Sequence, residues 1–458
     1  MTRAAPDAGR PLIGDAARAA ETLRAAGAGA GHRVLLDAPA SDRWSVWPFL
    51  LAARELGAAS LVADPGWSVR DREAVLADAA PDVVVRPSEV TVAAGTGADH
   101  GVFLLATTSG STGTPSVLAR TAESWRIGFE TLGPLPGPVL VPGPPSSTLY
   151  LFGALHALHH GLDPVLRDRF DPAEVPDGGA VHLVPAQLSA LLDHHDHHSG
   201  APAPRVVVCG GAHVGAAVRE RCARLLPGAE LVEYYGSAEH SLIAIRRGGG
   251  ALRPVPGVEV TVRDGVLWVD SPQAVLGRLR GGVLERATPG PTTVGDRGEL
   301  AGDGSLSVLG RAGATITSGG TQVAAEEVEQ VLRAVPGVAD VVVAGMPHPS
   351  LGSLVTAVVE AGDGTALRDL RAAARDGLAP AKRPRRWLRT TALPRLGSGK
   401  PARARVDAGL RDGTLDARPF DVRPLGAGRT PARPDPPDPG APEHGTSEHG
   451  TSDRSADR

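Results

Sequence analysis

The chain has 458 residues, of which 42% are hydrophobic and 21% are charged, a composition typical of a soluble globular protein with two or three domains. Its formal net charge of -4 provides no basic field for nucleic acid or anionic lipid. No apolar run approaches the ~18 residues of a membrane span, and the N-terminus lacks the apolar centre of a secretory signal. Two cysteines, Cys209 and Cys222, suit a reducing compartment. We therefore expect a cytoplasmic protein with no nucleic-acid partner and no membrane span.

Short apolar strands alternate with helix-length amphipathic segments along most of the chain. Such alternation indicates an α/β fold with largely parallel sheets. The expected strands, in chain order, are at 34–36, 61–62, 83–85, 102–105, 181–184, 206–208, 242–245, 258–262 and 266–269. The expected helices lie at 44–56, 69–79, 149–160, 186–192 and 214–226.

The pattern changes near Gly310, where we expect a domain boundary. Residues 1–310 form a large N-terminal α/β domain with several subdomains, and residues 311–412 form a small α+β domain. Its expected elements are helices at 325–335 and 367–377 and strands at 341–344 and 355–359. Residues 413–458 are Pro-rich and contain a tandem Glu-His-Gly-Thr-Ser repeat, which predicts a disordered tail.

A loop rich in Gly, Ser and Thr follows the apolar strand that ends at Leu105. Its glycines allow backbone N–H groups to converge on phosphate oxygens, and its hydroxyls add further donors. The Gly-Lys-Ser/Thr ending of a Walker A loop is absent. Taken alone, a loop of this composition is usually an ordinary loop. Its residues are Thr108, Ser109, Gly110, Ser111, Thr112, Gly113, Thr114 and Pro115.

Lysine is scarce in this chain. Of 47 basic residues only Lys382 and Lys400 are lysines, and the others are arginines. A lysine retained in such a composition indicates a need for a compact, mobile ammonium, which the planar arginine fork cannot replace. Lys400 is the stronger candidate for such a role, because Lys382 lies in an Arg-rich surface segment.

Together with later motifs, the 108–115 loop resembles the adenylate-forming superfamily of acyl-CoA synthetases, peptide-synthetase adenylation domains and luciferases. Seven family motifs occur in the family's order between residues 108 and 400. After the loop they are Gly210-Gly211-Ala212, Tyr235-Gly236-Ser237-Ala238-Glu239, Gly295-Asp296, Gly310-Arg311, Ser318-Gly319-Gly320 with Glu327-Val328-Glu329, and Leu393-Pro394 with Ser398-Gly399-Lys400. The short segment before the loop is closest in size to o-succinylbenzoate–CoA ligase-like members.

The resemblance implies a role for each motif. Thr108 to Gly113 would hold the β- and γ-phosphates of ATP, Tyr235 would stack on adenine and Asp296 would bind the ribose, with Arg311 assisting. Glu239 would ligate Mg²⁺, and Lys400 would act between the substrate carboxylate and the α-phosphate. The remaining nucleotide-site positions are Gly211, Ala212, Gly236, Ser237 and Gly319. Residues 1–310 would then be the AMP-binding domain and 311–412 its mobile C-terminal partner.

The implied activity is the ATP- and Mg²⁺-dependent, AMP-forming activation of a carboxylic acid, followed by transfer of the acyl group to CoA. Three departures from the family pattern weaken this inference, at Ser116, Ala238 and Gly313. Ser116 replaces a lysine near the leaving pyrophosphate, and Arg120, four residues on, is a cation that could substitute for it. Two alternatives remain: an adenylating enzyme that loads an acyl carrier protein or another acceptor, and a degenerate, non-catalytic nucleotide or acyl binder.

Two His-rich segments could carry additional chemistry. The run 193–198, Asp-His-His-Asp-His-His, has metal-capable side chains, but we expect the solvated end of the helix before it. His156, with His159 and His160, lies on a helix that should border the acyl site. Packing is the simpler interpretation of His156, and contact with substrate is the alternative.

Overall fold

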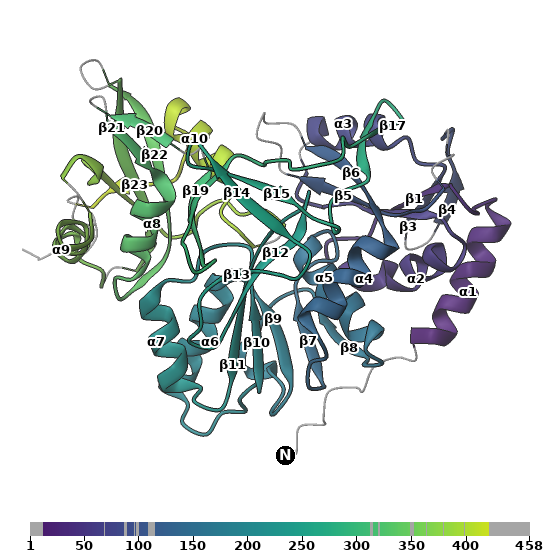
Figure 1. Ribbon diagram of the computed structural model, residues 1–458, viewed down its shortest axis with the longest axis horizontal. Coiled ribbons are helices and arrows are strands. Elements are labelled where there is room, and N and C mark those ends of the chain that lie inside the picture. Colours follow the sequence, from purple (N-terminus) through teal and green to yellow (C-terminus); the bar gives the residue numbers. More distant parts are fainter. Residues whose placement is uncertain are drawn as a thin grey trace, which may run out of the picture. The chain divides into compact units, whose positions relative to one another are not determined.

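The computed structural model describes residues 12–420, apart from 68, 87–88, 96, 98–99, 109–114, 312–314, 319–320, 349–351, 363, 379 and 398. Within these ranges four β-sheets organise the chain (Figure 1). None of the described helices is long and apolar enough to cross a membrane.

The first sheet has eight strands in the order β17-β16-β6-β5-β2-β1-β3-β4. Its centre is parallel and its two edges are antiparallel. The parallel strands are β1 (Arg33–Leu36), β2 (Ala59–Val62), β3 (Val83–Arg86) and β5 (Val102–Thr108). The antiparallel strands are β4 (Glu89–Val92), β6 (Ser116–Thr121), β16 (Gly277–Arg280) and β17 (Val283–Arg286).

The second sheet has seven strands in the order β13-β12-β11-β10-β9-β7-β8. Five of them are parallel: β7 (Val139–Pro142), β8 (Pro164–Arg167), β9 (Ala180–Leu183), β10 (Val206–Cys209) and β11 (Glu230–Ser237). The antiparallel strands β12 (Ser241–Arg247) and β13 (Arg253–Pro254) complete one edge. The α/β prediction is confirmed, and these parallel strands bring their carboxyl ends to one side, where open α/β sheets bind ligands.

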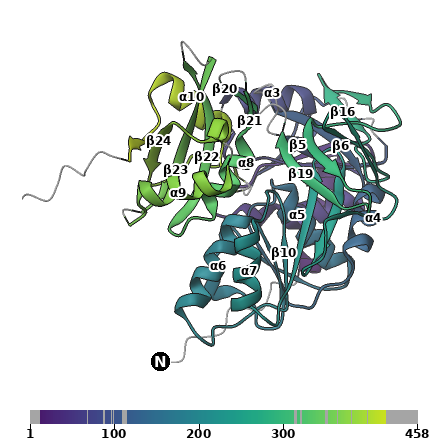
Figure 2. The same ribbon diagram turned by 60° about the vertical axis from the view of Figure 1, so that its left-hand side comes forward.

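Helices cover the two sheets. Residues of α4 (Ala122–Leu132) and α5 (Thr148–His159) share one hydrophobic core with strands of both sheets. Residues of α6 (Pro185–His197) and α7 (Ala216–Leu225) form a second core with the second sheet, along which these helices lie side by side (Figures 1 and 2). The remaining helices of this region are α1 (Leu12–Ala25), α2 (Trp47–Glu55) and α3 (Val69–Ala79).

Helix α6 is longer than the sequence predicted. It continues to His197 instead of ending at Leu192, so most of the His-rich run lies within its last turns. Arg221 on α7 explains the extension, because it donates to Asp193 at 2.6 Å and to Asp196 at 2.8 Å. Pairing with arginine accounts for both carboxylates, and no group of three or more metal-capable side chains occurs among the described residues.

A small antiparallel sheet and a separate α+β sheet follow. The small sheet contains β14 (Glu259–Arg263), β15 (Val266–Asp270), β18 (Asp296–Leu300) and β19 (Leu306–Arg311). The next sheet contains β20 (Thr315–Ser318), β21 (Thr321–Ala324), β22 (Val338–His348), β23 (Gly352–Ala361), β24 (Arg386–Thr390) and β25 (Arg418–Pro419). The first of these sheets therefore ends at Arg311 and the second begins at Thr315.

Both faces of the last sheet are buried. Val341 and Val343 of β22 pack with α8 (Ala325–Arg333) and α9 (Leu367–Gly377), which lie on one face (Figure 2). Val342, between them, packs instead with Val406 of α10 (Arg403–Asp412). This alternation follows from the two-residue repeat of a strand, whose successive side chains point to opposite faces.

The tail begins later than the sequence predicted. Residues 413–420 were expected to be disordered, but Gly413 caps α10 in the left-handed conformation and β25 pairs with β24. Phe420 contributes as well, because its ring lies 4.4 Å from the Arg389 guanidinium carbon. Residues 421–458 of the expected tail lie outside the described part of the chain.

We predict that truncation after Asp412 lowers the melting temperature clearly, whereas truncation after Phe420 leaves it nearly unchanged. The first truncation removes β25 and the Phe420 ring from β24, and the second removes neither. Differential scanning calorimetry of the two truncated proteins and the full chain measures this difference. Equal melting temperatures for the two truncations would show that residues 413–420 contribute no stability.

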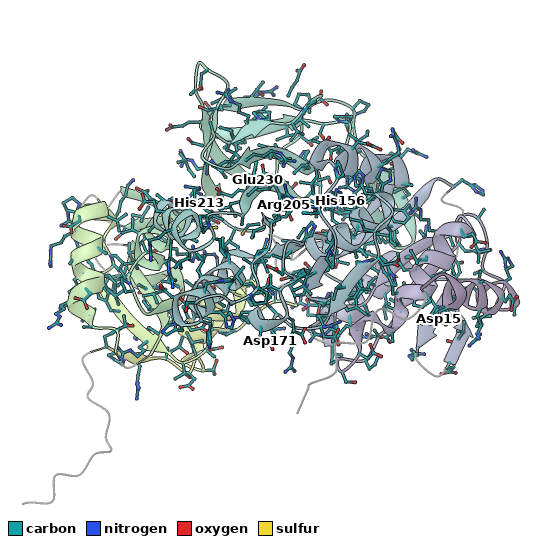
Figure 3. The ribbon with its side chains drawn as sticks, turned by 90° about the horizontal axis from the view of Figure 1, so that it is seen from below. Asp15, His156, Asp171, Arg205, His213 and Glu230 are labelled. Atoms are coloured by element: carbon teal, nitrogen blue, oxygen red, sulfur yellow. The ribbon has the colours of Figure 1, made fainter. Side chains whose placement is uncertain are left out.

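Three buried histidines are neutral in the folded protein. His156 of α5 (Figure 3), His182 of β9 and His240 are each 1% exposed or less. Burial lowers the pKa of His156 to about 4, of His182 to about 3 and of His240 to about 4. His156 donates from Nε2 to the Gly133 carbonyl at 2.8 Å, which supports the packing interpretation of this residue.

The free energy of unfolding should therefore fall as the pH decreases. An unfolded histidine has a pKa near 6.5, so below that pH the unfolded chain binds protons that these three folded side chains do not bind. Each histidine should remove up to about 1.4 kcal/mol per pH unit between about pH 6.5 and pH 4. Urea unfolding at several pH values measures the slope, and a His156→Gln variant should show a smaller one. A free energy of unfolding that is constant down to about pH 5 would contradict neutral burial.

Candidate active site

The tyrosine and the aspartate of two distant motifs meet in this structure. Tyr235 lies near the end of β11, and its hydroxyl donates to Asp296 Oδ2 at 2.6 Å. Asp296 is the first residue of β18 and is only 7% exposed. A short hydrogen bond to a carboxylate is among the stronger neutral–ionic contacts. It fixes the orientation of both side chains and joins β11 of the second sheet to β18 of the small sheet.

The turn between β11 and β12 is held by close backbone packing. A Cβ on Gly236 would lie 2.2 Å from the Ser241 carbonyl oxygen, so this position has no room for a side chain. Ser237 and His240 share a 3.1 Å hydrogen bond, and His240 Nε2 lies 2.7 Å from the Thr292 hydroxyl. Because His240 is neutral, it can link these two hydroxyls without adding a charge to the site.

Arg120 supports the Glu239 turn from within the core. Its guanidinium donates to the Ala238 carbonyl at 2.7 Å and to the Gln273 carbonyl at 2.5 Å, and the residue is 2% exposed. Burial lowers the pKa of Arg120 to about 10, and the negative charge of Glu239 partly offsets this shift. A cation whose pKa is near 10 remains charged at neutral pH. Glu239 itself is half-buried, and its carbonyl accepts from the Val275 N–H at 2.8 Å.

The contacts of Arg120 argue against the substitution considered for Ser116. Ser116 pairs with Thr108 across β5 and β6, at the base of the loop that is proposed to bind phosphate. Arg120 is four residues further along β6, or about 13 Å of extended strand. Its two terminal nitrogens are engaged with Ala238, Ser124 and Gln273 inside the core, so the suggestion that Arg120 replaces the loop lysine is wrong.

Lys400 lies against the loop that follows β10. A Cβ on Gly211 would lie 2.7 Å from Lys400 Cε and 3.1 Å from Nζ, so glycine provides the space that the lysine occupies. Gly211 also has a φ of +88°, in the left-handed region that favours glycine. The Cδ1 atom of Leu149, near the start of α5, would lie 3.4 Å from the same Cβ. The ammonium thus lies at the carboxyl end of the parallel sheet.

The hairpin that carries Lys400 is held by Arg395. The Arg395 guanidinium donates to the Gly399 carbonyl at 3.0 Å, to Asp340 at 3.1 Å and to Glu360 at 2.7 Å. The Lys400 carbonyl also accepts from the Leu396 N–H at 2.8 Å. These contacts tie the lysine hairpin to β22 and β23 within its own sheet.

The other predicted site residues are placed only in part. Thr108 is half-buried at the end of β5, while Ser109, Gly110, Ser111, Thr112, Gly113 and Gly319 lie outside the described residues. Ala212 is exposed next to Gly211. The backbone of Arg311 pairs with Asp296 across β18 and β19, but the description does not extend to its side chain.

The residues present suit a magnesium ion that is bound mainly through a nucleotide. Mg²⁺ prefers hard oxygen ligands and usually uses one or two carboxylates together with substrate phosphates. Glu239 supplies one half-buried carboxylate, and the described residues hold no cluster of three metal-capable groups. The donor set therefore fits Mg²⁺ accompanied by phosphates rather than a metal in a protein cage.

Sequence reasoning missed the supports of this site. His240 directly follows Glu239, so its place in the sequence was a usable signal. Arg395 lies inside the Lys400 motif at a position that the pattern leaves open. The contact from Arg120 to residue 238 has no signal in the sequence, because it joins positions 118 residues apart.

Comparison with known proteins found two family models and several related sequences. A family model described as AMP-binding enzyme matches residues 97–277, and a model of the AMP-binding enzyme C-terminal domain matches residues 327–400. An uncharacterised acyl-CoA ligase of Bacillus subtilis, YhfT, is 30% identical over 341 residues, covering 68% of this chain and 69% of the relative. A probable 2-succinylbenzoate–CoA ligase of Mycobacterium tuberculosis is 31% identical over 331 residues, covering 67% and 84%.

The fold is also similar to solved structures. An E. coli MenE variant with bound OSB-AMS superposes with a TM-score of 0.75, covering 88% of this chain and 92% of that chain, at 23% sequence identity. At this identity the likeness establishes the fold, with a large N-terminal domain and a smaller C-terminal domain.

We predict that Arg120→Met lowers the free energy of unfolding by about 2–4 kcal/mol, because the carbonyls of Ala238 and Gln273 lose their buried donor. Arg120→Lys should recover part of the loss by keeping one donor. Arg126→Met is the matched control, since Arg126 is exposed on α4 and should tolerate the change. Urea unfolding compares the variants. If Arg120→Met were as stable as Arg126→Met, Arg120 would not hold the turn.

Proposed function

The chain belongs to the AMP-binding enzyme family, and from this premise we propose that it activates a carboxylic acid with ATP and transfers the acyl group to CoA. The observation that carries the proposal is the position of Lys400, whose side chain lies against Gly211 at the carboxyl end of the parallel sheet. The acyl-CoA ligases among its relatives support the same activity.

The first step joins two anions. An oxygen of the substrate carboxylate attacks the α-phosphorus of ATP, the bond to the bridging oxygen breaks, and pyrophosphate leaves with the electron pair. The products are the acyl-adenylate and pyrophosphate. Lys400 is proposed to lie between the carboxylate and the α-phosphate, where a fixed cation reduces their repulsion as they approach.

The second step transfers the acyl group. The sulfur of CoA attacks the acyl carbon, the thiol proton is released, and the bond from the acyl carbon to the adenylate oxygen breaks. AMP leaves with the oxygen that came from the carboxylate. CoA is our preferred acceptor, with an acyl carrier protein as the alternative, because the relatives described above are CoA ligases.

The nucleotide is proposed to bind along the Tyr235–Asp296 pair. The Tyr235 ring would stack on adenine, and the Asp296 carboxylate, aligned by the tyrosine hydroxyl at 2.6 Å, would accept from the ribose hydroxyls. Glu239 would hold Mg²⁺ together with the phosphate oxygens. When bound, this ion neutralises phosphate charge.

The departures at Ser116 and Ala238 leave the proposed reaction intact. Lys400, Glu239 and Asp296 are all present, and only the backbone carbonyl of Ala238 is used in the described contacts of its turn. Both cysteines are unpaired and buried, which suits the cytoplasmic location expected from the sequence. A non-catalytic binder would have no evident use for a lysine retained in a chain with only two.

We predict that Lys400→Ala reduces acid-dependent ATP–pyrophosphate exchange by at least about a hundredfold, because a charge contact confined to the transition state contributes about 2.7–4 kcal/mol. Thioester formation from supplied acyl-adenylate should fall far less, since that step needs no cation between two anions.

The matched control is Lys382→Ala. Lys382 is the chain's other lysine, and its ammonium lies 2.7 Å from both carboxylate oxygens of Glu327. Its loss should leave exchange within about twofold of the parent enzyme. Equal losses in both half-reactions for Lys400→Ala would contradict the role proposed for Lys400.

A further inference from the structure

All three tyrosines of this chain lie near the end of the second sheet, and two of them fill space beside the proposed carboxylate position. Tyr234 packs its ring against Gly210, where a Cβ would lie 2.2 Å from the ring carbon Cζ. Tyr150 packs in the same way on Gly143, where a Cβ would lie 2.0 Å from Cε2. Gly143 closely follows β7 and Gly210 follows β10. Each ring therefore occupies the space that a side chain would otherwise need at the carboxyl end of a strand.

Tyr150 is fixed in its position. It is 1% exposed, and its hydroxyl donates to Gln187 Oε1 at 2.9 Å. Gln187 in turn donates from Nε2 to the Pro142 carbonyl at 3.0 Å. The Tyr150 ring therefore cannot rotate to admit a ligand without breaking the hydrogen bond of its hydroxyl to Gln187.

Tyr234 lies near this fixed ring and contacts the loop that the lysine also contacts. It belongs to the apolar layer that also contains Tyr150, and its hydroxyl lies within electrostatic range of the Tyr150 hydroxyl and of Cys209. Burial raises the pKa of Tyr234, so its hydroxyl stays neutral. The surface that Tyr234 presents is therefore an uncharged aromatic ring.

The Tyr234 ring and the lysine contact neighbouring residues of the same loop. Gly210, which contacts Tyr234, is adjacent in sequence to Gly211, which contacts Lys400. Neighbouring Cα atoms are about 3.8 Å apart. An acid that is held at Lys400 by its carboxylate and extends along Gly211 and Gly210 would meet the Tyr234 ring after a few atoms.

We propose that Tyr234, backed by Tyr150, closes the inner end of the acyl site and restricts the enzyme to small carboxylic acids, either short straight chains or a single ring. This inference rests on the proposed function. Long-chain fatty acids are excluded because their extra methylenes would have to displace a packed ring. Displacing a side chain in a close-packed interior has a high free-energy cost.

The first test is acid-dependent ATP–pyrophosphate exchange by the full-length enzyme with butanoate, octanoate, dodecanoate and benzoate. We expect exchange with butanoate or benzoate to exceed exchange with dodecanoate by at least about a hundredfold, since each excluded methylene is worth about a factor of four. A preference for dodecanoate would overturn the inference and leave the proposed function standing. Exchange with none of these acids, nor with a wider acid panel, would overturn both.

The second test changes the ring itself. Tyr234→Ala should raise the kcat/KM for octanoate relative to butanoate by at least about tenfold, because the removed ring opens space for several methylenes. Tyr234→Phe is the matched control; it keeps the ring and should keep the parent preference. Tyr234→Ala with measurable exchange but an unchanged chain-length preference would overturn the inference. If Tyr234→Ala does not fold, Tyr234→Leu should show a smaller shift in chain-length preference in the same direction. An unchanged preference in Tyr234→Leu would then overturn the inference.

Discussion

The hydrogen bond from Tyr235 to Asp296 joins strands of two different sheets, and the proposed nucleotide site depends on it. Tyr235 lies on β11, the last parallel strand of its sheet in chain order, while Asp296 begins β18 of the small antiparallel sheet, 61 residues later. The 2.6 Å contact brings the tyrosine hydroxyl and the carboxylate together and fixes the orientation of both side chains.

Elsewhere in the proposed site, buried and half-buried polar side chains hold backbone turns in place. Arg120 holds the carbonyl before Glu239, neutral His240 bridges Ser237 and Thr292, and Arg395 holds the hairpin of Lys400. Leaving a buried donor or acceptor without a hydrogen-bond partner costs free energy, so each turn has one strongly preferred conformation. A site formed by loops acquires in this way the rigidity that charge neutralisation requires.

Much of the fold could be predicted from the sequence, because strand and helix periodicity is a local property. The α/β class was confirmed, and helices such as α3 and α9 have the predicted bounds. The end of α6 and the start of the tail were wrong, because ion pairs from Arg221 and strand pairing by β25 are tertiary effects. The motifs indicated which residues are proposed to carry the chemistry. The side chains that support them, such as Arg120, depend on contacts between distant positions that no single-sequence pattern reveals.

The central claim is that the acid is activated as an adenylate, and oxygen tracing tests it most directly. The enzyme would be incubated with ATP, CoA and an acid that supports exchange, carrying ¹⁸O in both carboxylate oxygens, and the AMP would be examined by mass spectrometry. Attack of the carboxylate on the α-phosphorus predicts one ¹⁸O atom in each AMP formed. Acyl-CoA production accompanied by unlabelled AMP, or by ADP and labelled phosphate, would contradict the account.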